Sequence, residues 1–354
     1  MEKLCFAIQG KTFLKSMMPL IIFSNKLGIQ PVIFCFAKRM GKPYDNIDVA
    51  YLTKVLADFK VFCELVMVDN NQEIIASMRA NNLCNIVCQD AQHHFKKLCS
   101  EESICVFSIA VFFDTLHYAN DLRLKRTDYE NESKPNVVYF PDKKFKDEFI
   151  RIFPTYNTVF KSLGSPFYDH ALFAPKHEKT NKSVSFLVTL QNLVDISLQK
   201  ELESFIEYCV DSDIDLFIKT KYRAPWELQN KKLLKKINMS NFELGFPYTA
   251  LTVILNTDIH ISSYSTSAIE SSYFGKPCIN LETVAKNKLT YAVNSIKHDY
   301  DFDDVFNSDI CKTVSSNIKD TYLSLASIKK EPKEILTFES NNSVRILKDI
   351  KNFL

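Results

Sequence analysis

Residues 4–36, LCFAIQGKTFLKSMMPLIIFSNKLGIQPVIFCF, decide the fold class. An apolar run at 4–8 ends at Gln9-Gly10, a helical pattern of apolar residues follows up to Gly28, and a second apolar run covers 31–36. Strands buried on both faces are continuous apolar runs, and two parallel strands need a crossover that is usually a helix. The order of strand, glycine turn, helix and strand therefore predicts the βαβ unit of a parallel sheet.

The same alternation continues in two blocks. In the first block we expect helices at 48–59, 72–81, 91–99 and 144–153, and strands at 61–68, 84–88, 104–113, 137–140 and 157–162. In the second we expect strands at 184–190, 215–220, 258–262 and 277–281, and helices at 198–210, 227–237, 248–255 and 265–274. Polar, turn-forming residues separate the blocks, which indicates a hinge. A chain of 354 residues also exceeds the ~250–300 residues at which one core stops growing.

We therefore predict an α/β protein with two Rossmann-like domains facing across a cleft, where ligands bind at the carboxyl ends of the strands. The first domain should cover residues 1–163 and the second 183–335, with a linker at 164–182.

Composition excludes several classes of protein. The 44 Lys+Arg nearly balance the 42 Asp+Glu, whereas nucleic-acid-binding domains usually carry a strong basic excess. The longest apolar run, 104–113, is too short for a membrane span, which needs about 20 residues. The six glycines form neither a Gly-x-Gly-x-x-Gly fingerprint nor a phosphate-binding P-loop.

The ten cysteines are scattered, and the first residues are predicted to open a strand rather than a signal peptide. We expect reduced thiols and a cytoplasmic protein, with peripheral contact to the inner face of the cell membrane left open. Cys84 and Cys88 would lie about 13 Å apart along one strand, so they cannot share a zinc ion and are assigned to the core. We predict no metal and no cofactor.

The segment at 260–277, HISSYSTSAIESSYFGKP, is the candidate site. A strand ends in a hydroxyl-rich turn, and a helix begins that Gly275 and Pro277 terminate. The free N–H groups of such a helix start bind phosphate, so Ser265, Thr266 and Ser267 are candidate phosphate ligands. Glu270, one turn later on the same face, could accept hydrogen bonds from ribose hydroxyls. The alternative is that Ser265 only caps the helix and Glu270 is a solvated side chain.

This segment resembles the donor-nucleotide segment of GT-B glycosyltransferases of the bacterial capsule and lipopolysaccharide type. It is also similar to the matching segments of teichoic-acid glycerophosphotransferases and of non-hydrolysing UDP-N-acetylglucosamine 2-epimerases. In those families, small residues matching Ser265 and Thr266 bind phosphate, and an acid matching Glu270 binds ribose. A second stretch at 163–169, LGSPFYD, resembles the Gly-x-Pro-x-x-Asp linker that leads into their nucleotide domain.

The resemblance implies an acceptor domain first, a donor domain second, and a C-terminal helix at 336–354 that crosses back to the first domain. Where these families usually have His-Pro after the second strand of the donor domain, this chain has Tyr222-Arg223, so that loop departs from the pattern. Further donor-binding candidates follow predicted strand ends or lie in the loop expected to contact the base. They are Thr189, Gln191, Lys219, Lys221, Phe246, Tyr248 and, in the first domain, Gly10. Surface packing is the alternative role for each.

An inverting transferase needs a carboxylate or imidazole to take the acceptor proton. Polar residues after first-domain strands are the candidates, Asp114 or Asp90 first, with His117 and His93 behind them. A single polar residue at a strand end can equally be a helix cap or turn former.

We predict a metal-independent glycosyltransferase that moves a sugar from a nucleotide-sugar donor to a glycan or lipid-linked acceptor in surface polysaccharide synthesis, with no nucleic-acid partner. Three alternatives stay open. The first is a UDP-N-acetylhexosamine 2-epimerase, although those enzymes carry Gly-Thr-Arg-Pro where this chain has Gln9-Gly10-Lys11-Thr12. The second is a glycerophosphotransferase using a CDP-glycerol type of donor. The third is a noncatalytic nucleotide-sugar-binding partner of another enzyme.

Overall fold

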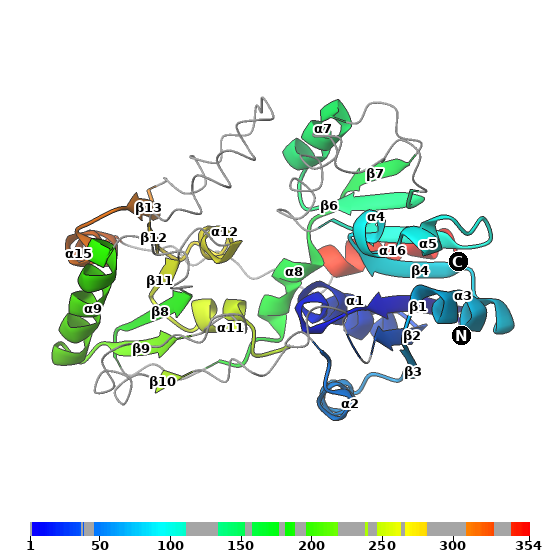
Figure 1. The fold of residues 1–354 in the computed structure, drawn as a ribbon, viewed down its shortest axis with the longest axis horizontal. Coiled ribbons are helices and arrows are strands. Elements are labelled where there is room, and N and C mark those ends of the chain that lie inside the picture. The colour runs from blue at the N-terminus through cyan, green and yellow to red at the C-terminus, as the bar shows by residue number, and fades with distance from the viewer. Residues whose placement is uncertain are drawn as a thin grey trace. The chain divides into compact units, whose positions relative to one another are not determined.

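A computed structural model describes twelve stretches of the chain. They are residues 2–36, 38, 46–110, 134–152, 158–176, 181–187, 196–218, 238–239, 246–262, 266–281, 309–328 and 341–354. The chain divides into two compact units (Figure 1), one formed by Met1–His170 with Leu336–Leu354 and the other by Ala171–Ile335.

The first unit is built on a parallel sheet. Within the described residues, seven strands lie in the order β3-β2-β1-β4-β5-β6-β7. Their bounds are β1 Glu2–Ile8, β2 Ile29–Phe36, β3 Glu64–Val68, β4 Asn85–Gln89, β5 Cys105–Ile109, β6 Val137–Phe140 and β7 Val159–Ser162. The helices are η1 Lys11–Phe13, α1 Leu14–Lys26, α2 Val49–Asp58, α3 Asn71–Ala80, α4 Ala91–His94, α5 Lys96–Cys99 and α7 Lys143–Ile152. The predicted βαβ unit is confirmed, since β1 and β2 pair in parallel and α1 connects them along the chain.

Helix termini follow the capping chemistry of the sequence. Asp48 caps α2 and Asn70 caps α3, each accepting hydrogen bonds from two backbone N–H groups of the first turn. Gly28 adopts φ +77° between α1 and β2, a conformation that other residues rarely take. These local signals therefore place the ends of the helices.

Two elements differ from expectation. The single helix predicted at 91–99 is two short helices, because Phe95 leaves the helical conformation (φ −130°, ψ 36°), and its fully buried ring packs against Phe36. The strand predicted at 84–88 begins one residue later, so Cys84 is exposed whereas Cys88 is buried. The assignment of Cys84 to the core was wrong.

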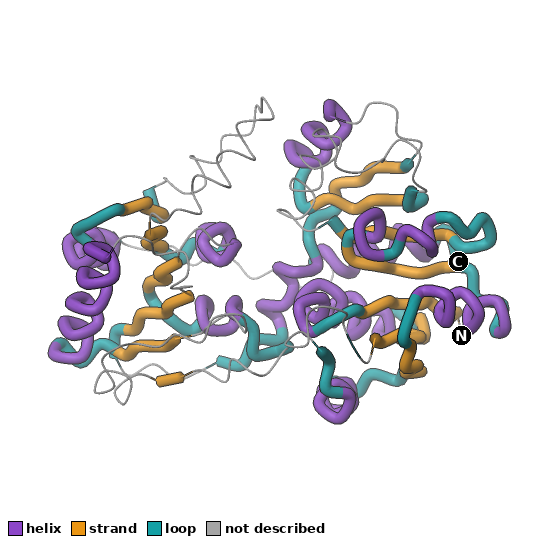
Figure 2. The backbone as a smooth tube through the Cα atoms, in the orientation of Figure 1, coloured by secondary structure: helices purple, strands orange, loops and turns teal. Residues whose placement is uncertain are grey.

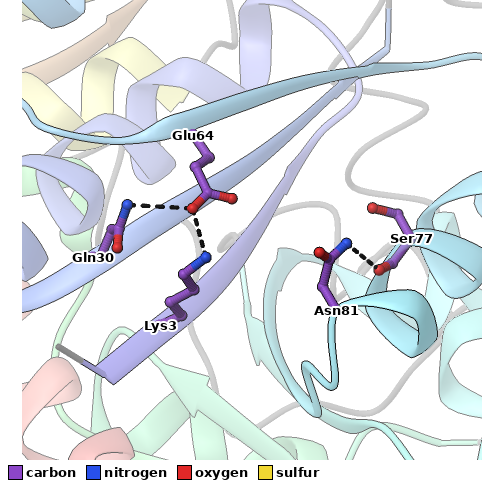
Figure 3. Close-up of polar contacts among 5 residues, drawn as sticks. All are labelled: Lys3, Gln30, Glu64, Ser77 and Asn81. Atoms are coloured by element: carbon purple, nitrogen blue, oxygen red, sulfur yellow. Dashed lines mark hydrogen bonds and ion pairs between the residues drawn. The ribbon is translucent and has the colours of Figure 1, made fainter.

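The edge of this sheet is tied by side chains (Figure 3). Glu64 on edge strand β3 accepts a hydrogen bond from Lys3 Nζ at 2.5 Å and one from Gln30 Nε2 at 3.3 Å. Nearby, Asn81 Nδ2 donates to the Ser77 carbonyl at 2.8 Å, which adds a second hydrogen bond to the one that this carbonyl accepts from Asn81 N at 3.1 Å. The Lys3–Glu64 pair is exposed, so it stabilises the fold by at most about 1 kcal/mol.

The stretch resembling a family linker is fixed to the C-terminal helix α16, Asn342–Lys351. Gly164 (φ +92°) precedes the short helix α8, Pro166–Asp169, which Ser165 caps. The buried Asp169 carboxylate accepts hydrogen bonds from Asn342 N at 3.1 Å and from Ser343 N and Oγ at 2.5 and 2.6 Å. An anion at a helix N-terminus is favoured, yet burial raises the pKa of Asp169 to about 6 against the effect of these hydrogen bonds.

Helix α16 also packs along the first sheet. Asp349 accepts hydrogen bonds from Tyr139 Oη at 2.8 Å and from Lys161 Nζ at 2.6 and 2.7 Å. The Phe353 ring meets that of Phe107 edge-on, with centroids 5.4 Å apart. The C-terminal helix therefore lies in the first unit.

The second unit repeats the architecture with a parallel sheet of order β10-β9-β8-β11-β12-β13, counted over its described residues. Its strands are β8 Ser183–Leu187, β9 Asp215–Ile218, β10 Asn238–Met239, β11 Ile259–Ser262, β12 Cys278–Leu281 and β13 Cys311–Val314. Its helices are α9 Ile196–Asp211, α11 Ala250–Leu255, α12 Thr266–Tyr273 and α15 Ile318–Ala326, and the short η4, His170–Leu172, adjoins it. Helices α9 and α15 cover one face of the sheet, and α11 and α12 cover the other (Figure 2).

The core of this unit lies between the sheet and α9 with α15. Phe186, Phe205 and Tyr322 meet there, the rings of Phe205 and Tyr322 being 5.3 Å apart. The helix predicted at 227–237 falls outside the described residues. Among those that are described, no helix is both long and apolar enough to cross a bilayer.

Candidate functional site

The second sheet has a topological switch point between β8 and β11. The chain continues from β8 to β9 on one side and from β11 to β12 on the other. In open parallel sheets, ligands bind beyond the carboxyl ends of the two strands at such a point. Ser262 ends β11 there, and α12 begins four residues later at Thr266. The motif singled out from the sequence thus lies at the expected edge of the sheet.

Helix α12 is held firmly at its C-terminal end. Gly275 adopts φ +65°, Lys276 N donates to the Ser271 carbonyl at 2.8 Å, and Ser271 Oγ donates to the Lys276 carbonyl at 2.9 Å. Lys276 Nζ reaches the Thr257 carbonyl just before β11, at 2.9 Å. The ammonium also complements the negative end of the helix dipole. These contacts anchor the C-terminal end of the helix to the sheet.

Glu270 is buried, with only 4% of its surface exposed. The alternative that it is a solvated side chain is therefore wrong. A carboxylate is almost never buried without a partner. The buried Glu270 carboxylate, one turn after the start of α12, therefore requires polar groups around it. Ser265 lies outside the described residues, as does the side chain of Thr266.

A chain of hydrogen bonds runs beneath the first turn of α12. Thr257 Oγ1 lies 2.8 Å from Ser185 Oγ, Ser185 Oγ lies 2.9 Å from His260 Nδ1, and His260 Nε2 lies 3.0 Å from Ser267 Oγ. Ser267 Oγ is in turn 3.0 Å from Ser262 Oγ. All five residues are at most 2% exposed. The hydroxyl of Ser267 thus bonds inward, so the predicted phosphate contact of this residue would be made by its backbone N–H.

The His260 imidazole in this chain of hydrogen bonds is neutral. Burial lowers the pKa of His260 to about 3, against the opposing effect of a hydrogen bond to the backbone of Ser185. A neutral imidazole has one N–H donor and one acceptor nitrogen. Each nitrogen faces one hydroxyl, so both sides of the ring are satisfied.

Sequence reasoning missed this chain, since Ser185 and His260 are 75 positions apart. Their partnership follows from strand pairing, in which Ser185 on β8 lies opposite His260 on β11. One local signal was present, because His260 and Ser262 are two positions apart and therefore on one face of their strand.

The other donor-site candidates are partly described. Phe246 is fully buried and packs against Phe173, with ring centroids 5.7 Å apart, whereas Tyr248 is 37% exposed. Of the two rings, only that of Tyr248 is exposed. Four candidates fall outside the described residues: Thr189, Gln191, Lys219 and Lys221.

In the first unit, the switch point lies between β1 and β4. Gly10 follows β1 with an extended backbone (φ −174°), and Asp90 follows β4, so both lie at the carboxyl ends of adjacent strands. Asp90 is 2% exposed and adopts a left-handed conformation (φ 44°), which is uncommon outside glycine. Its backbone N–H donates to the Ile109 carbonyl at 3.0 Å.

The remaining candidates for the base are less defined. His93 lies in α4, but its side chain is not described, and Asp114 and His117 fall outside the described residues. Within the described stretches, no three His, Cys, Asp or Glu residues gather as metal ligands would. The roles of these residues and the metal-independence of the site stay predictions.

Comparison with known proteins places the fold. No protein-family model matches this sequence, and no curated protein matches it either. Among solved structures, the UDP-GlcNAc 2-epimerase of Methanocaldococcus jannaschii superimposes with a TM-score of 0.61 at 14% identity, over 99% of both chains. The wall teichoic acid polymerase TagF gives 0.57 at 13% identity, over 100% of this chain and 90% of that one. Medicago truncatula UGT71G1, complexed with UDP-glucose, gives 0.52 at 12% identity, over 99% and 94%.

These neighbours and the two parallel sheets define the class of the protein, an α/β chain with the GT-B glycosyltransferase-like fold. The same fold serves glycosyltransferases and 2-epimerases, so the reaction must be argued from the site.

Proposed function

We propose that this protein is a metal-independent glycosyltransferase of surface polysaccharide synthesis, with the nucleotide-sugar donor bound by the second unit. The observation that carries the proposal is the buried Glu270 carboxylate one turn beyond the start of α12, at the switch point of the second sheet. Structural neighbours were solved with UDP-GlcNAc and UDP, and with UDP-glucose, which supports a nucleotide sugar as the ligand.

The helix start supplies binding without a metal. The N–H groups of its first turn and the positive end of its dipole attract the donor phosphates, while Glu270 accepts hydrogen bonds from the ribose hydroxyls. Lys219 and Lys221, which follow β9 in the chain, are proposed to neutralise the leaving phosphate.

The acceptor hydroxyl then attacks the anomeric carbon. The new C–O bond forms as the bond from that carbon to the donor phosphate oxygen breaks, and the electron pair leaves with the nucleotide. Asp90 or Asp114 is proposed to take the hydroxyl proton, with His93 and His117 as alternatives. Asp90 follows β4 at the switch point of the first sheet, and this position supports its choice among the described residues. The acceptor is proposed to be a glycan or lipid-linked sugar.

A 2-epimerase is the second candidate, because several neighbours of this fold are UDP-GlcNAc 2-epimerases. Incubation with UDP-GlcNAc separates the two, since an epimerase interconverts the sugar without an acceptor whereas a transferase releases nucleotide only when an acceptor is present. Release of CMP on transfer from a CDP-glycerol type of donor would favour a glycerophosphotransferase, in line with the TagF fold. Tight nucleotide binding without turnover of any donor would indicate a noncatalytic binding partner.

The experiment that tests the donor site is calorimetry with UDP, CMP, CDP, GDP and ADP on the wild type, Glu270→Ala and Glu207→Ala. Glu207 is an exposed glutamate on α9, on the opposite face of the same sheet from α12, so its replacement is the matched control. Losing hydrogen bonds between a carboxylate and ribose should weaken binding about tenfold or more, since such bonds contribute ~1.5–3 kcal/mol. Equal affinities for Glu270→Ala and the wild type would refute the assignment.

A further inference from the structure

We propose that His260 is a positioning residue of the donor site, which holds the first turn of α12 so that its backbone N–H groups face the donor phosphate. This inference rests on the proposed function and assigns a role to a residue that is not one of the candidate phosphate ligands.

The contacts of the ring support this role. Nε2 lies 3.0 Å from Ser267 Oγ in the first turn of α12, and Nδ1 lies 2.9 Å from Ser185 Oγ on the neighbouring strand β8. Ser185 is itself hydrogen-bonded to Thr257, two residues before β11. The imidazole therefore links two central strands of the sheet to the helix start, with no solvent contact that could compete.

The hydroxyl of Ser267 shows what the link accomplishes. A serine near a helix start often turns its oxygen back onto the backbone N–H groups of that turn. Here Ser267 Oγ bonds to His260 and Ser262, both on β11. These two contacts fasten the first turn of α12 to the sheet, and the N–H groups of a helix start are the groups that bind phosphate.

A double-mutant cycle tests the inference, using His260→Leu, Ser267→Ala and the double variant, with the affinity for the nucleotide that binds the wild type as the readout. If His260 acts through Ser267, each single change should weaken binding roughly five- to tenfold, and the double variant should bind no more weakly than the weaker single variant. Effects that multiply in the double variant would overturn the inference.

A conservative pair keeps the test informative if the leucine variant fails to fold. The amide of Gln extends to about the position of Nε2, whereas the shorter Asn reaches only that of Nδ1. His260→Gln should therefore keep nucleotide affinity within about threefold of the wild type, and His260→Asn should lose it as His260→Leu does. Equal affinity of the two variants would overturn the positioning role.

Ser271→Ala is the matched control. It removes a buried hydroxyl from the same helix, but at the end where Ser271 Oγ bonds the Lys276 carbonyl. We expect a lower Tm with unchanged nucleotide affinity, whereas a loss equal to that of His260→Leu would show that any damage to α12 weakens binding and would overturn the inference.

The two proposals fail in distinguishable ways. If the wild type binds none of the five nucleotides, both fall. Suppose that the wild type binds a nucleotide, that Glu270→Ala weakens this binding, and that the losses of binding free energy in His260→Leu and Ser267→Ala add in the double variant. Only the role of His260 is then refuted.

Discussion

Replacing Gly164 with alanine should destabilise the first unit substantially. Gly164 adopts φ +92°, and a Cβ there would lie 2.0 Å from Asn342 Oδ1 and 2.5 Å from Asn342 Cγ. The left-handed backbone costs an L-residue about 1–2 kcal/mol. Displacing the buried Asn342 breaks its 2.9 Å hydrogen bond to the Ser165 carbonyl, which costs about 1–3 kcal/mol more. The expected loss of unfolding free energy is therefore about 2–5 kcal/mol.

Gly28→Ala is the comparison that isolates the contact with α16. Gly28 has a similar φ of +77°, but a Cβ at this position would meet no atom within 4 Å, so only the backbone cost of about 1–2 kcal/mol applies. Urea unfolding followed by circular dichroism measures both variants, and hydrogen exchange of α16 amides locates the change. Equal losses for the two variants, or unaltered exchange in α16 of Gly164→Ala, would refute the reasoning.

Three further predictions concern charge. Lys161→Met removes the ammonium that donates to the two Asp349 oxygens and should destabilise the protein by about 1–2 kcal/mol. Urea unfolding of a double-mutant cycle with Asp349→Asn measures the coupling. The losses of unfolding free energy in the two single variants should not add in the double variant. The pKa of His260 falls from 6.5 to about 3 on folding. As the pH falls below 6.5, the unfolded chain is protonated before the folded one, so the free energy of unfolding should drop by about 2 kcal/mol between pH 7 and 5. His260→Gln should lack this drop. The pKa of Asp169 instead rises from 3.8 to about 6 on folding. Its contribution to the free energy of unfolding is therefore present at low pH and lost as the pH rises through 6. The protein should gain about 1 kcal/mol of stability between pH 7 and 5, and Asp169→Asn should lack this gain. A pH dependence identical to that of the wild type in either variant would contradict the assignment for that residue.

Local patterns were sufficient for most of the fold. The strand at residues 137–140 was predicted with the bounds that the structure has, and the helix expected at 265–274 became Thr266–Tyr273. Continuous apolar runs and glycine or proline stops carry this information, since both act within a few residues. The short strand Cys311–Val314 and the helix Ile318–Ala326 were missed, because a four-residue strand at the sheet edge has little periodicity to detect.

The candidate site was predicted less completely. The segment proposed to bind phosphate was visible as a unit, because strand, turn and helix follow one another in the sequence. The burial of Glu270 and the inward turn of Ser267 depend on how the helix packs against the sheet, and the partner of His260 comes from a strand 75 positions away. No local pattern contains such contacts.

The pairing of Ser185 with His260 also bears on how the proposed donor site forms during folding. A slip of one residue between β8 and β11 would turn the His260 ring to the other face of the sheet, where α9 and α15 lie. Its two nitrogens would then be buried among apolar side chains. If the donor binds as proposed, nucleotide binding should emerge only when β8 and β11 have paired in the correct register. A partly folded chain that lacks this pairing should hold no donor.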